Sequence, residues 1–313
     1  MLELERYSSL CKDEWDTFVS ISKNGSFLFY RDYQEYHSDR FQDHSLVFRS
    51  KEKTIALLPA CREGDSLVSH GGLTFGGILS DEKMTTPVML EVFELLLSHA
   101  KQEMFSQIIY KACPSIYHAY PADEDLYALQ INNARLFRRD VSSVLSPSDH
   151  PKMQERRKRS IKKALKFGVT CRETGDVKEF WSILSEVLKL NHNATPAHSL
   201  DEITLLKSKF PNEIRLFCAY QDDRMIAGTL IFENQQIAHT QYIASSDLGK
   251  SLGGLDLIFG ELISKVYTSK KWFSFGISTE NQGMALNEGL IGQKEGFGAR
   301  ACVHDFYQID LAV

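Results

Sequence analysis

The stretch Gly249-Lys-Ser-Leu-Gly-Gly-Leu-Asp-Leu-Ile-Phe-Gly-Glu-Leu-Ile263 follows a predicted strand and leads into an amphipathic helix. Two adjacent glycines at such a junction allow backbone N–H groups at the start of the helix to face a bound phosphate. The same two glycines also suit a plain turn in which strand and helix pack closely. The stretch alone leaves both interpretations open, a phosphate-binding turn and a structural one.

Hydrophobic periodicity predicts an alternation of helices and strands around this stretch. From about residue 170 the predicted order is helix, helix, three strands, helix, strand, helix and strand. The predicted strands cover residues 214–220, 225–233, 237–245, 272–277 and 301–309. The predicted helices cover residues 152–167, residues 176–190, a segment opened by the capping box Ser199-Leu-Asp-Glu202, and a segment from a second box, Thr279-Glu-Asn-Gln282, to about residue 296.

The first half of the chain shows a similar alternation. Apolar residues in 88–103 recur with the period of a helix, and residues 107–112 form a short apolar strand. The segments predicted as extended or mixed cover residues 45–49, 54–61, 73–79, 126–131 and 136–145. The segment Ser146-Pro-Ser-Asp-His-Pro151 has the prolines and turn-forming residues of a linker, so we predict two domains, 1–150 and 151–313.

The composition excludes several classes of protein. The 313 residues are 43% hydrophobic and 25% charged, with a net charge of −5, which gives no reason to expect DNA as a partner. The N-terminal residues predict no signal peptide, and no apolar run approaches the roughly 20 residues that span a bilayer. The six cysteines are scattered without a CxxC pair, which predicts reduced thiols, a cytoplasmic location and no metal site.

Three segments carry a resemblance to a known family: Arg156-Arg-Lys-Arg-Ser-Ile-Lys-Lys-Ala-Leu-Lys-Phe-Gly-Val169, Phe273-Ser-Phe-Gly-Ile-Ser-Thr279 and Asn287-Glu-Gly-Leu-Ile-Gly-Gln-Lys-Glu-Gly-Phe-Gly298. Together with the order of elements, they resemble GNAT acyltransferases of the branch similar to the FemAB and FemX peptidoglycan aminoacyltransferases. The resemblance covers about residues 152–310. It implies an α/β fold with a mixed sheet and two GNAT-like halves packed side by side, the first on the acceptor side and the second on the donor side.

The resemblance also implies a reaction. An acyl group would pass from acyl-CoA to an amine on a sugar or cell-envelope precursor by direct attack, without a metal. One alternative is FemX-like use of aminoacyl-tRNA, with peripheral contact to a lipid-linked precursor. The chain lacks a sustained heptad run of the kind found in tRNA-binding arms of the family, which favours acyl-CoA over tRNA. The other alternative is a binding module without catalytic activity.

The donor site would lie at the glycine turn, where the N-terminus of a helix can hold phosphates. The candidate donor-binding residues are Lys250, Ser251, Leu252, Gly253, Gly254 and Asn287. Asp256, in the first turn of the expected helix, would repel a bound diphosphate and counts against this interpretation.

The candidate catalytic residues are Lys294, Glu280, His192 and His198. The resemblance makes Lys294 a candidate electrophile, and the alternative is a solvated lysine near the end of a helix. A histidine has a pKa suited to taking a proton from an amine, and Glu280 is a second candidate base. Each also has a structural interpretation, as a side chain packed at a helix entry or as a partner of the helix dipole.

The candidate substrate-binding residues are His70, Gly71, Gly72, Thr74, Tyr110, Lys111, Arg159 and Tyr242. The first four belong to His70-Gly-Gly-Leu-Thr-Phe-Gly-Gly77, a glycine-dense loop that suits close approach of a ligand or serves only as a loop. Arg159 lies in the basic run of residues 156–166, whose seven cations form either a ligand-binding or a solvated face. Tyr242 follows His239 by three residues, so on a regular strand the two face opposite sides.

Overall fold

The computed structural model describes residues 2–311, apart from the side chains of residues 191 and 192. The chain forms two compact units. Unit 1 consists of Met1–Asp140, Glu280–Ala285 and Val303–Val313, and unit 2 of Val141–Thr279 and Leu286–Cys302. The chain passes from one unit to the other four times: within the long strands β9 (Arg135–Leu145) and β17 (Arg300–Asp310), between Thr279 and Glu280, and between Ala285 and Leu286. The proline-rich linker at the predicted domain boundary lies inside unit 2.

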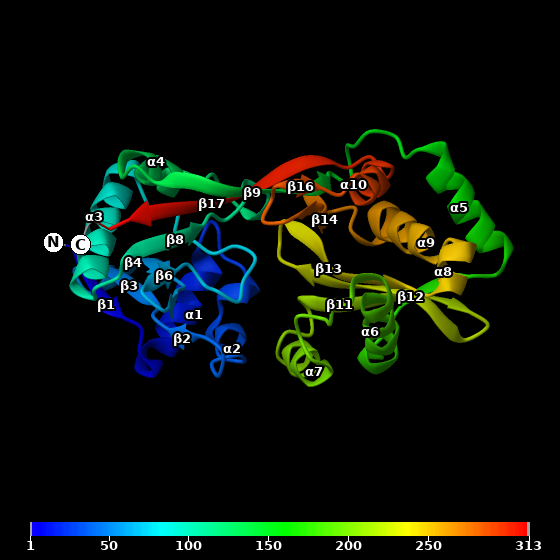
Figure 1. Ribbon diagram of the computed structural model, residues 1–313, viewed down its shortest axis with the longest axis horizontal. Coiled ribbons are helices and arrows are strands. Elements are labelled where there is room, and N and C mark those ends of the chain that lie inside the picture. Colours follow the sequence, from blue (N-terminus) through cyan, green and yellow to red (C-terminus); the bar gives the residue numbers. More distant parts are fainter. Residues whose placement is uncertain (1, 312–313) are drawn as a thin grey trace. The chain divides into compact units, whose positions relative to one another are not determined.

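Unit 1 contains two groups of strands and four α-helices (Figure 1). An antiparallel sheet has the order β1-β3-β4-β7, and a second row of strands has the order β17-β8-β6-β5-β2. The strands are β1 (Leu2–Arg6), β2 (Gln42–Asp43), β3 (Leu46–Ser50), β4 (Lys53–Leu58), β5 (Cys61–Glu63), β6 (Ser66–Val68), β7 (Leu79–Ser80) and β8 (Gln107–Lys111). The helices are α1 (Lys12–Ile21), α2 (Arg31–Gln34), α3 (Thr86–Gln102) and α4 (Glu124–Ile131).

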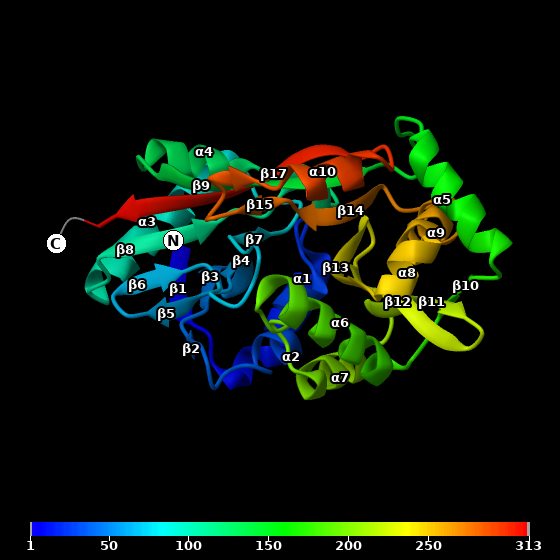
Figure 2. The ribbon, with the colours of Figure 1, turned by 45° about the vertical axis from the view of Figure 1, so that its right-hand side comes forward.

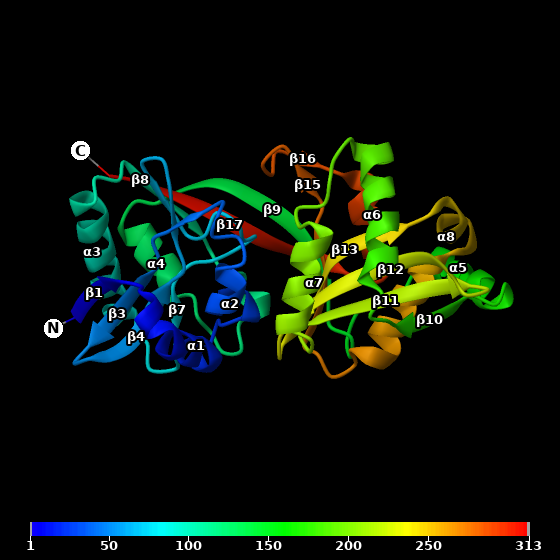
Figure 3. The same cartoon turned by 90° about the horizontal axis from the view of Figure 1, so that it is seen from below.

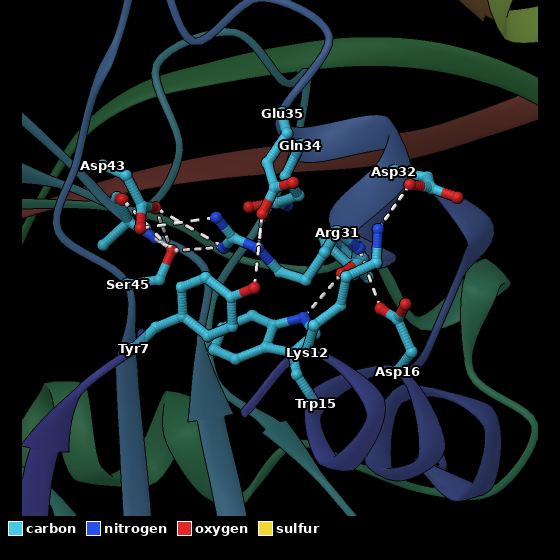
Figure 4. Close-up of polar contacts among 12 residues, drawn as sticks. Tyr7, Lys12, Trp15, Asp16, Arg31, Asp32, Gln34, Glu35, Asp43 and Ser45 are labelled. Atoms are coloured by element: carbon cyan, nitrogen blue, oxygen red, sulfur yellow. Dashed lines mark hydrogen bonds and ion pairs between the residues drawn. The ribbon is translucent and has the colours of Figure 1, made fainter. Parts of the chain in front are cut away.

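A buried arginine joins the N-terminal elements of unit 1. The Arg31 guanidinium lies 3.8 Å from the centroid of the Tyr7 ring and donates to Glu35 and to Ser45 Oγ, at 3.1 and 3.2 Å (Figure 4). Asp43 forms a further ion pair with it at 3.4 Å. Because a buried cation is stable only when it is paired and hydrogen-bonded, these contacts hold β1, α2 and the start of β3 together.

Unit 2 has a single mixed sheet with the order β10-β11-β12-β13-β14-β9. All neighbours are antiparallel except β13 and β14, which are parallel. The strands are β10 (Thr170–Glu173), β11 (Ile214–Gln221), β12 (Arg224–Glu233), β13 (Ile237–Ser245) and β14 (Trp272–Ile277). The helices are α5 (Glu155–Lys166), α6 (Val177–His192), α7 (Leu200–Lys209), α8 (Asp247–Leu252), α9 (Gly254–Glu261) and α10 (Glu288–Glu295).

Helices cover both faces of the unit 2 sheet. Helices α6 and α7 lie on one face (Figure 3), and α5, α8 and α9 lie on the other (Figure 1). Two consecutive residues of β12 face opposite sides of the sheet: Gly228 lies against Phe180 of α6, and Ala227 lies against Gly254 of α9. The apolar core between the sheet and α9 includes Ile258 and Phe273, both fully buried.

The structure confirms the predicted α/β class with a mixed sheet, and most of the predicted helices and strands of residues 152–310 are present. The helix predicted from Thr279 is wrong at its start. Thr279–Glu280 (β15) and Ala285–Leu286 (β16) pair as a hairpin, and Asn281, Gln282 and Gly283 between them all have positive φ. Residues with positive φ in succession reverse the chain and cannot begin a helix.

Two predictions in the first half are also wrong. Residues 126–131 belong to helix α4. Of the predicted strand 73–79, only Leu79 is part of a strand, the two-residue β7 (Leu79–Ser80). Helix α4 has a mixed distribution of apolar residues, so its period could not be recognised from so short a segment. Among residues 2–311, no helix is long and apolar enough to cross a membrane.

Unit 1 contains several buried histidines whose environment keeps them neutral. Burial lowers the pKa of His44 and His304 to about 4 and that of His70 to about 3. His44 Nε2 lies 2.9 Å from His99 Nε2, and burial lowers the pKa of His99 as well. If both rings were protonated, they would face each other as like charges at this distance.

We predict that unit 1 loses stability as the pH falls from about 6.5 to about 4. Over this range the unfolded chain binds protons that the buried rings exclude, so the free energy of unfolding falls. The measurement is Trp15 fluorescence against pH in a Trp181→Phe, Trp272→Phe variant. The matched control keeps Trp181 as the single tryptophan and reports on unit 2. Equal acid transitions in both variants would contradict the prediction.

Candidate functional site

The parallel strands β13 and β14 part after three residue pairs. They are joined at Ile237↔Trp272, Ala238↔Phe273 and His239↔Ser274, and β13 then continues to Ser245. The register of β13 against β12 shifts between Leu230 and Ile231, which leaves Gln241 as an extra residue. A β-bulge bends the strand that contains it, so β13 turns away from β14 just beyond the last pair.

Helix α8 starts at the end of β13, earlier than predicted. Ser246 is its N-cap, and the Ser246 hydroxyl accepts a hydrogen bond from Gly249 N–H at 3.1 Å. The glycine pair lies further on, between α8 and α9, where Gly253 has φ of +80°. A Cβ atom on Gly253 would lie 2.4 Å from Ser160 Oγ of α5. The pair therefore serves close packing between helices and does not form the strand-to-helix turn.

A polar pocket of about 280 Å³ lies in unit 2 where α5, α8, α9 and α10 meet the end of β13. The residues that line it are Arg156, Arg157, Ser245, Gly249, Lys250, Gly253, Leu255, Asp256, Gly289 and Gln293. Three of them carry a positive charge and one a negative charge. The N-terminal turn of α10, marked by Gly289, adds the positive end of a helix dipole.

Asp256 does not oppose an anion here as strongly as the sequence suggested. Arg157 donates to one of its carboxylate oxygens at 2.9 Å, and Ser160 donates to the other at 2.7 Å. The Asp256 charge is thus balanced inside the pocket wall. Arg156 and Lys250 remain as cations at the pocket; Arg156 donates to Gly292 O at 2.6 Å, and Lys250 pairs with the fully exposed Asp247.

Of the candidate donor-binding residues, Lys250 and Gly253 line the pocket. Ser251 contributes a carbonyl that accepts from Lys163 at 2.7 Å, and Gly254 lies against the sheet. Asn287 is the N-cap of α10, where its side chain accepts from Leu290 N–H at 2.9 Å. Ser251, Leu252, Gly254 and Asn287 are not among the lining residues.

Lys294 lies at the parted end of β14 with its ammonium turned into the protein. It donates to Gly276 O, Ile277 O and Ser278 Oγ at 2.9, 2.6 and 2.9 Å. An ammonium has three protons, so all of them are used by this turn. Burial lowers the pKa of Lys294 to about 8. The geometry favours a positioning role at β14 over direct contact with an acyl carbonyl.

His198 and Tyr242 are brought together on the α6–α7 face. His198 Nδ1 lies 2.6 Å from Tyr242 Oη, and the His198 backbone N–H donates to the same oxygen at 3.2 Å. Because Oη accepts from that N–H, the hydroxyl proton is available to Nδ1. The Trp181 ring lies 5.0 Å from the Tyr242 ring, and burial raises the pKa of Tyr242.

The bulge also corrects the prediction for His239. Its partner on β12 is Phe232 and that of Tyr242 is Leu230, two residues apart, so His239 and Tyr242 face the same side. His239 Nδ1 lies 3.1 Å from Ser274 Oγ. Glu280 is an exposed residue of hairpin strand β15 in unit 1. His192 ends α6, and its side chain lies outside the described residues.

The glycine-dense loop of unit 1 is held mainly by its own unit. Lys111 Nζ donates to His70 O, Gly71 O and Leu73 O at 2.8, 3.1 and 3.0 Å. Tyr110 is fully buried, donates to Asp125 at 2.5 Å and accepts from Ile78 N–H. These contacts make Lys111 and Tyr110 structural residues of the loop and core. Gly72 and Thr74 are exposed.

Sequence reasoning missed Arg156, Arg157 and Gln293 as pocket residues and placed weight on Arg159, which faces outward. A signal was available in the helical period. Arg157 precedes the apolar Ala164 by seven residues, two turns of a helix, so both lie on the side that packs against the domain. Arg159 lies on the opposite side.

No protein-family model and no curated protein matches this sequence. Solved structures do match. FemX matches with a TM-score of 0.69 at 10% identity, over 99% of this chain and 97% of FemX. The C-terminal domain of a putative lysylphosphatidylglycerol synthetase from Agrobacterium fabrum matches with a TM-score of 0.64 at 12% identity, over 97% and 93% of the two chains.

A tandem GNAT protein from the clavulanic acid biosynthesis pathway matches with a TM-score of 0.55 at 11% identity, over 100% of this chain and 99% of that one. Identities this low establish the fold alone. The chain has a FemX-like tandem GNAT fold, as the three sequence segments predicted.

We predict that Lys294→Met lowers the free energy of unfolding by about 3 kcal/mol, because it leaves two carbonyls and a hydroxyl buried without their donor. Urea denaturation of the full chain measures the change. Lys265→Met is the matched control, since Lys265, in the turn Leu262–Val266 that follows α9, forms an exposed pair with Glu261 and should change stability by less than about 0.5 kcal/mol. Similar midpoints for the two variants would show that Lys294 does not hold β14.

Proposed function

We propose that this protein is a GNAT-type transferase that moves an acyl group from acyl-CoA to an amine on a sugar or other cell-envelope precursor. The observation that carries the proposal is the polar pocket at the end of β13, the strand that parts from β14 after His239. A donor with phosphates and a long arm to its thioester requires both features. Cations and a helix N-terminus suit the phosphates, and parted strands can admit the arm.

The charges of the pocket support binding of the donor phosphates. Arg156 can bind two phosphate oxygens with its planar guanidinium, and Lys250 supplies a point charge beside it. Because Arg157 balances the charge of Asp256 and Ser160 donates a hydrogen bond to it, the remaining charge of the lining favours an anion. Gly289 lies in the first turn of α10, where the helix dipole is positive.

The opening supports binding of an extended arm. Beyond His239↔Ser274, β13 continues through the bulge at Gln241 and, among residues 237–245 and 272–277, forms no further pair with β14. The main chain of such a strand can accept an extended ligand with the hydrogen bonds of an added strand. Lys294 keeps the other side of the opening in place through the carbonyls of Gly276 and Ile277.

Proton transfer would fall to Tyr242 and His198. The acceptor amine would pass its proton to Tyr242 Oη as the Tyr242 hydroxyl proton moves to His198 Nδ1, and the nitrogen lone pair would form the new bond to the acyl carbon. The bond between the acyl carbon and sulfur would break, and the thiolate would leave and take up a proton from solvent, to which His198 returns the proton that it received. The 2.6 Å contact between Nδ1 and Oη supports this pairing. Tyr242 lies on β13 past the point of parting, on the face opposite Ser245 of the pocket.

The choice of acceptor rests on the fold relatives. One of them is named as a lysylphosphatidylglycerol synthetase, a name that specifies an aminoacylated lipid. That name supports a cell-envelope component as the first class of acceptor to test, although phosphatidylglycerol itself is lysylated on a hydroxyl and not on an amine. The alternative donor is aminoacyl-tRNA, whose phosphates the exposed cations of residues 156–166 would contact.

We predict that CoA binds the protein and that Lys250→Gln and Arg156→Gln each weaken binding about five-fold, because each removes one charge from the phosphate site. Isothermal titration calorimetry with CoA measures the affinity. Lys265→Gln, an exposed cation of the same unit, is the control and should bind like the wild type. Tight binding of charged tRNA with no binding of CoA would contradict the donor assignment.

We predict that Tyr242→Phe lowers kcat for N-acylation at least about 100-fold with little change in the affinity for CoA, because it removes the hydroxyl that relays the proton. The assay is release of free CoA thiol from acetyl-CoA with a panel of amino sugars. Tyr220→Phe, which changes a buried tyrosine on β11, two strands away from β13, is the control. Unchanged turnover in Tyr242→Phe would remove this residue from the mechanism, and CoA binding without turnover on any amine would favour a binding module.

A further inference from the structure

Helix α5 has an outer face that the pocket does not use. Arg159, Lys162 and Lys166 are spaced by three and four residues, so they lie along one side of the helix. All three are exposed, and within residues 2–311 none of the three takes part in an ion pair. The opposite side packs on the unit, with Ala164 fully buried and Ile161 against Gly260 of α9. Figure 2 shows α5 along the outside of α8 and α9.

This face is strongly positive apart from Glu155, which precedes Arg159 by four residues and therefore lies on the same side of the helix. Glu155, at the first position of α5, is the one acidic residue of the helix, and it pairs with Lys158 at 2.7 Å. Lys163 is also exposed and reaches the carbonyl of Ser251. The net charge of −5 for the whole chain makes such a local excess of cations a distinct feature of unit 2.

Two large apolar side chains lie at the C-terminal end of the same helix. Leu165 is 56% exposed and Phe167 is 52% exposed. They stand beside Lys162 and Lys166 in the sequence, and the aliphatic stems of those lysines can lie along an apolar surface while their ammonium groups remain in water. Cations on one side with exposed leucine and phenylalanine beside them are the composition of a helix that lies in a membrane interface.

We propose that the outer face of α5 docks this protein on an anionic phospholipid surface. Arg159, Lys162 and Lys166 face the lipid phosphates, and Leu165 and Phe167 enter the headgroup region. Charge complementarity and the adjacent apolar pair favour lipid over RNA, since binding of single strands relies on several aromatic rings in a row and α5 offers only Phe167. The docking does not depend on the donor or the acceptor proposed above.

The experiment is co-sedimentation of the full chain with vesicles of phosphatidylcholine containing about one-third phosphatidylglycerol, compared with pure phosphatidylcholine. We expect binding to the anionic vesicles that weakens with added salt. The triple variant Arg159→Gln, Lys162→Gln, Lys166→Gln should bind about 100-fold more weakly, roughly five-fold for each cation. The matched control, Lys178→Gln, Lys189→Gln, Lys271→Gln, removes the same charge from other exposed positions of unit 2 and should bind like the wild type.

A second variant tests the apolar contact. Leu165→Ser with Phe167→Ser should keep the circular dichroism of the wild type and bind the anionic vesicles about ten-fold more weakly. Equal binding to both kinds of vesicle, or equal loss in the triple variant and its control, would overturn the proposal. Binding of bulk tRNA that the triple variant loses, without vesicle binding, would assign the face to RNA and overturn it too. Self-association that depends on Leu165 and Phe167 in the absence of vesicles would also overturn the proposal, because it would assign these side chains to contact between copies of the chain.

Discussion

The extra residue in β13 is the constraint on which the geometry of unit 2 depends. Gln241 bends the strand just after its last pair with β14, and Gly276, with φ of +74°, turns β14 at a similar level. Two parallel strands that bend apart leave unpaired backbone, which is unfavourable unless another group satisfies it. On β14 that group is Lys294, whose ammonium accounts for two carbonyls in succession. The bulge and the lysine together stabilise the point at which β13 and β14 part.

Unit 1 contains a similar pair of parallel strands, but there the backbone beyond the last residue pair is still hydrogen-bonded. Strands β6 and β8 are parallel and joined through helix α3, as β13 and β14 are joined through α8 and α9. Past the last pair, however, Ser69 N–H still donates to Ile109 O, and Gly76 N–H donates to Lys111 O. The Lys111 ammonium then binds three carbonyls of the intervening loop. The glycine-dense loop that starts at His70 therefore takes the place beyond the last β6–β8 pair, whereas β13 and β14 in unit 2 part without such a loop. This difference supports placing the donor in unit 2.

Much of the fold could be predicted from the sequence because its signals are local. The strands of residues 214–245 are long and apolar, and the capping box at Ser199 is present with both of its hydrogen bonds. The site could be predicted less well, because it depends on contacts between segments far apart in the chain. The sequence predicted that Asp256 would repel a bound anion, but Arg157, almost a hundred residues earlier in the chain, forms an ion pair with it. Likewise, one inserted residue at Gln241 changes which side of β13 every later side chain faces, and no residue type marks such an insertion.

The two sides of helix α5 make different contacts. Its inner side supplies Arg157 to balance Asp256 and Ser160 to pack against Gly253, and both contacts shape the pocket wall. A glycine at position 253 is needed since any side chain there would meet α5 and push the helix away. The glycine pair thus contributes to anion binding indirectly, by letting a cationic helix approach α8 and α9. The outer side of α5 keeps its cations exposed, and a helix fixed so firmly on its inner side can present them in a constant orientation to a surface.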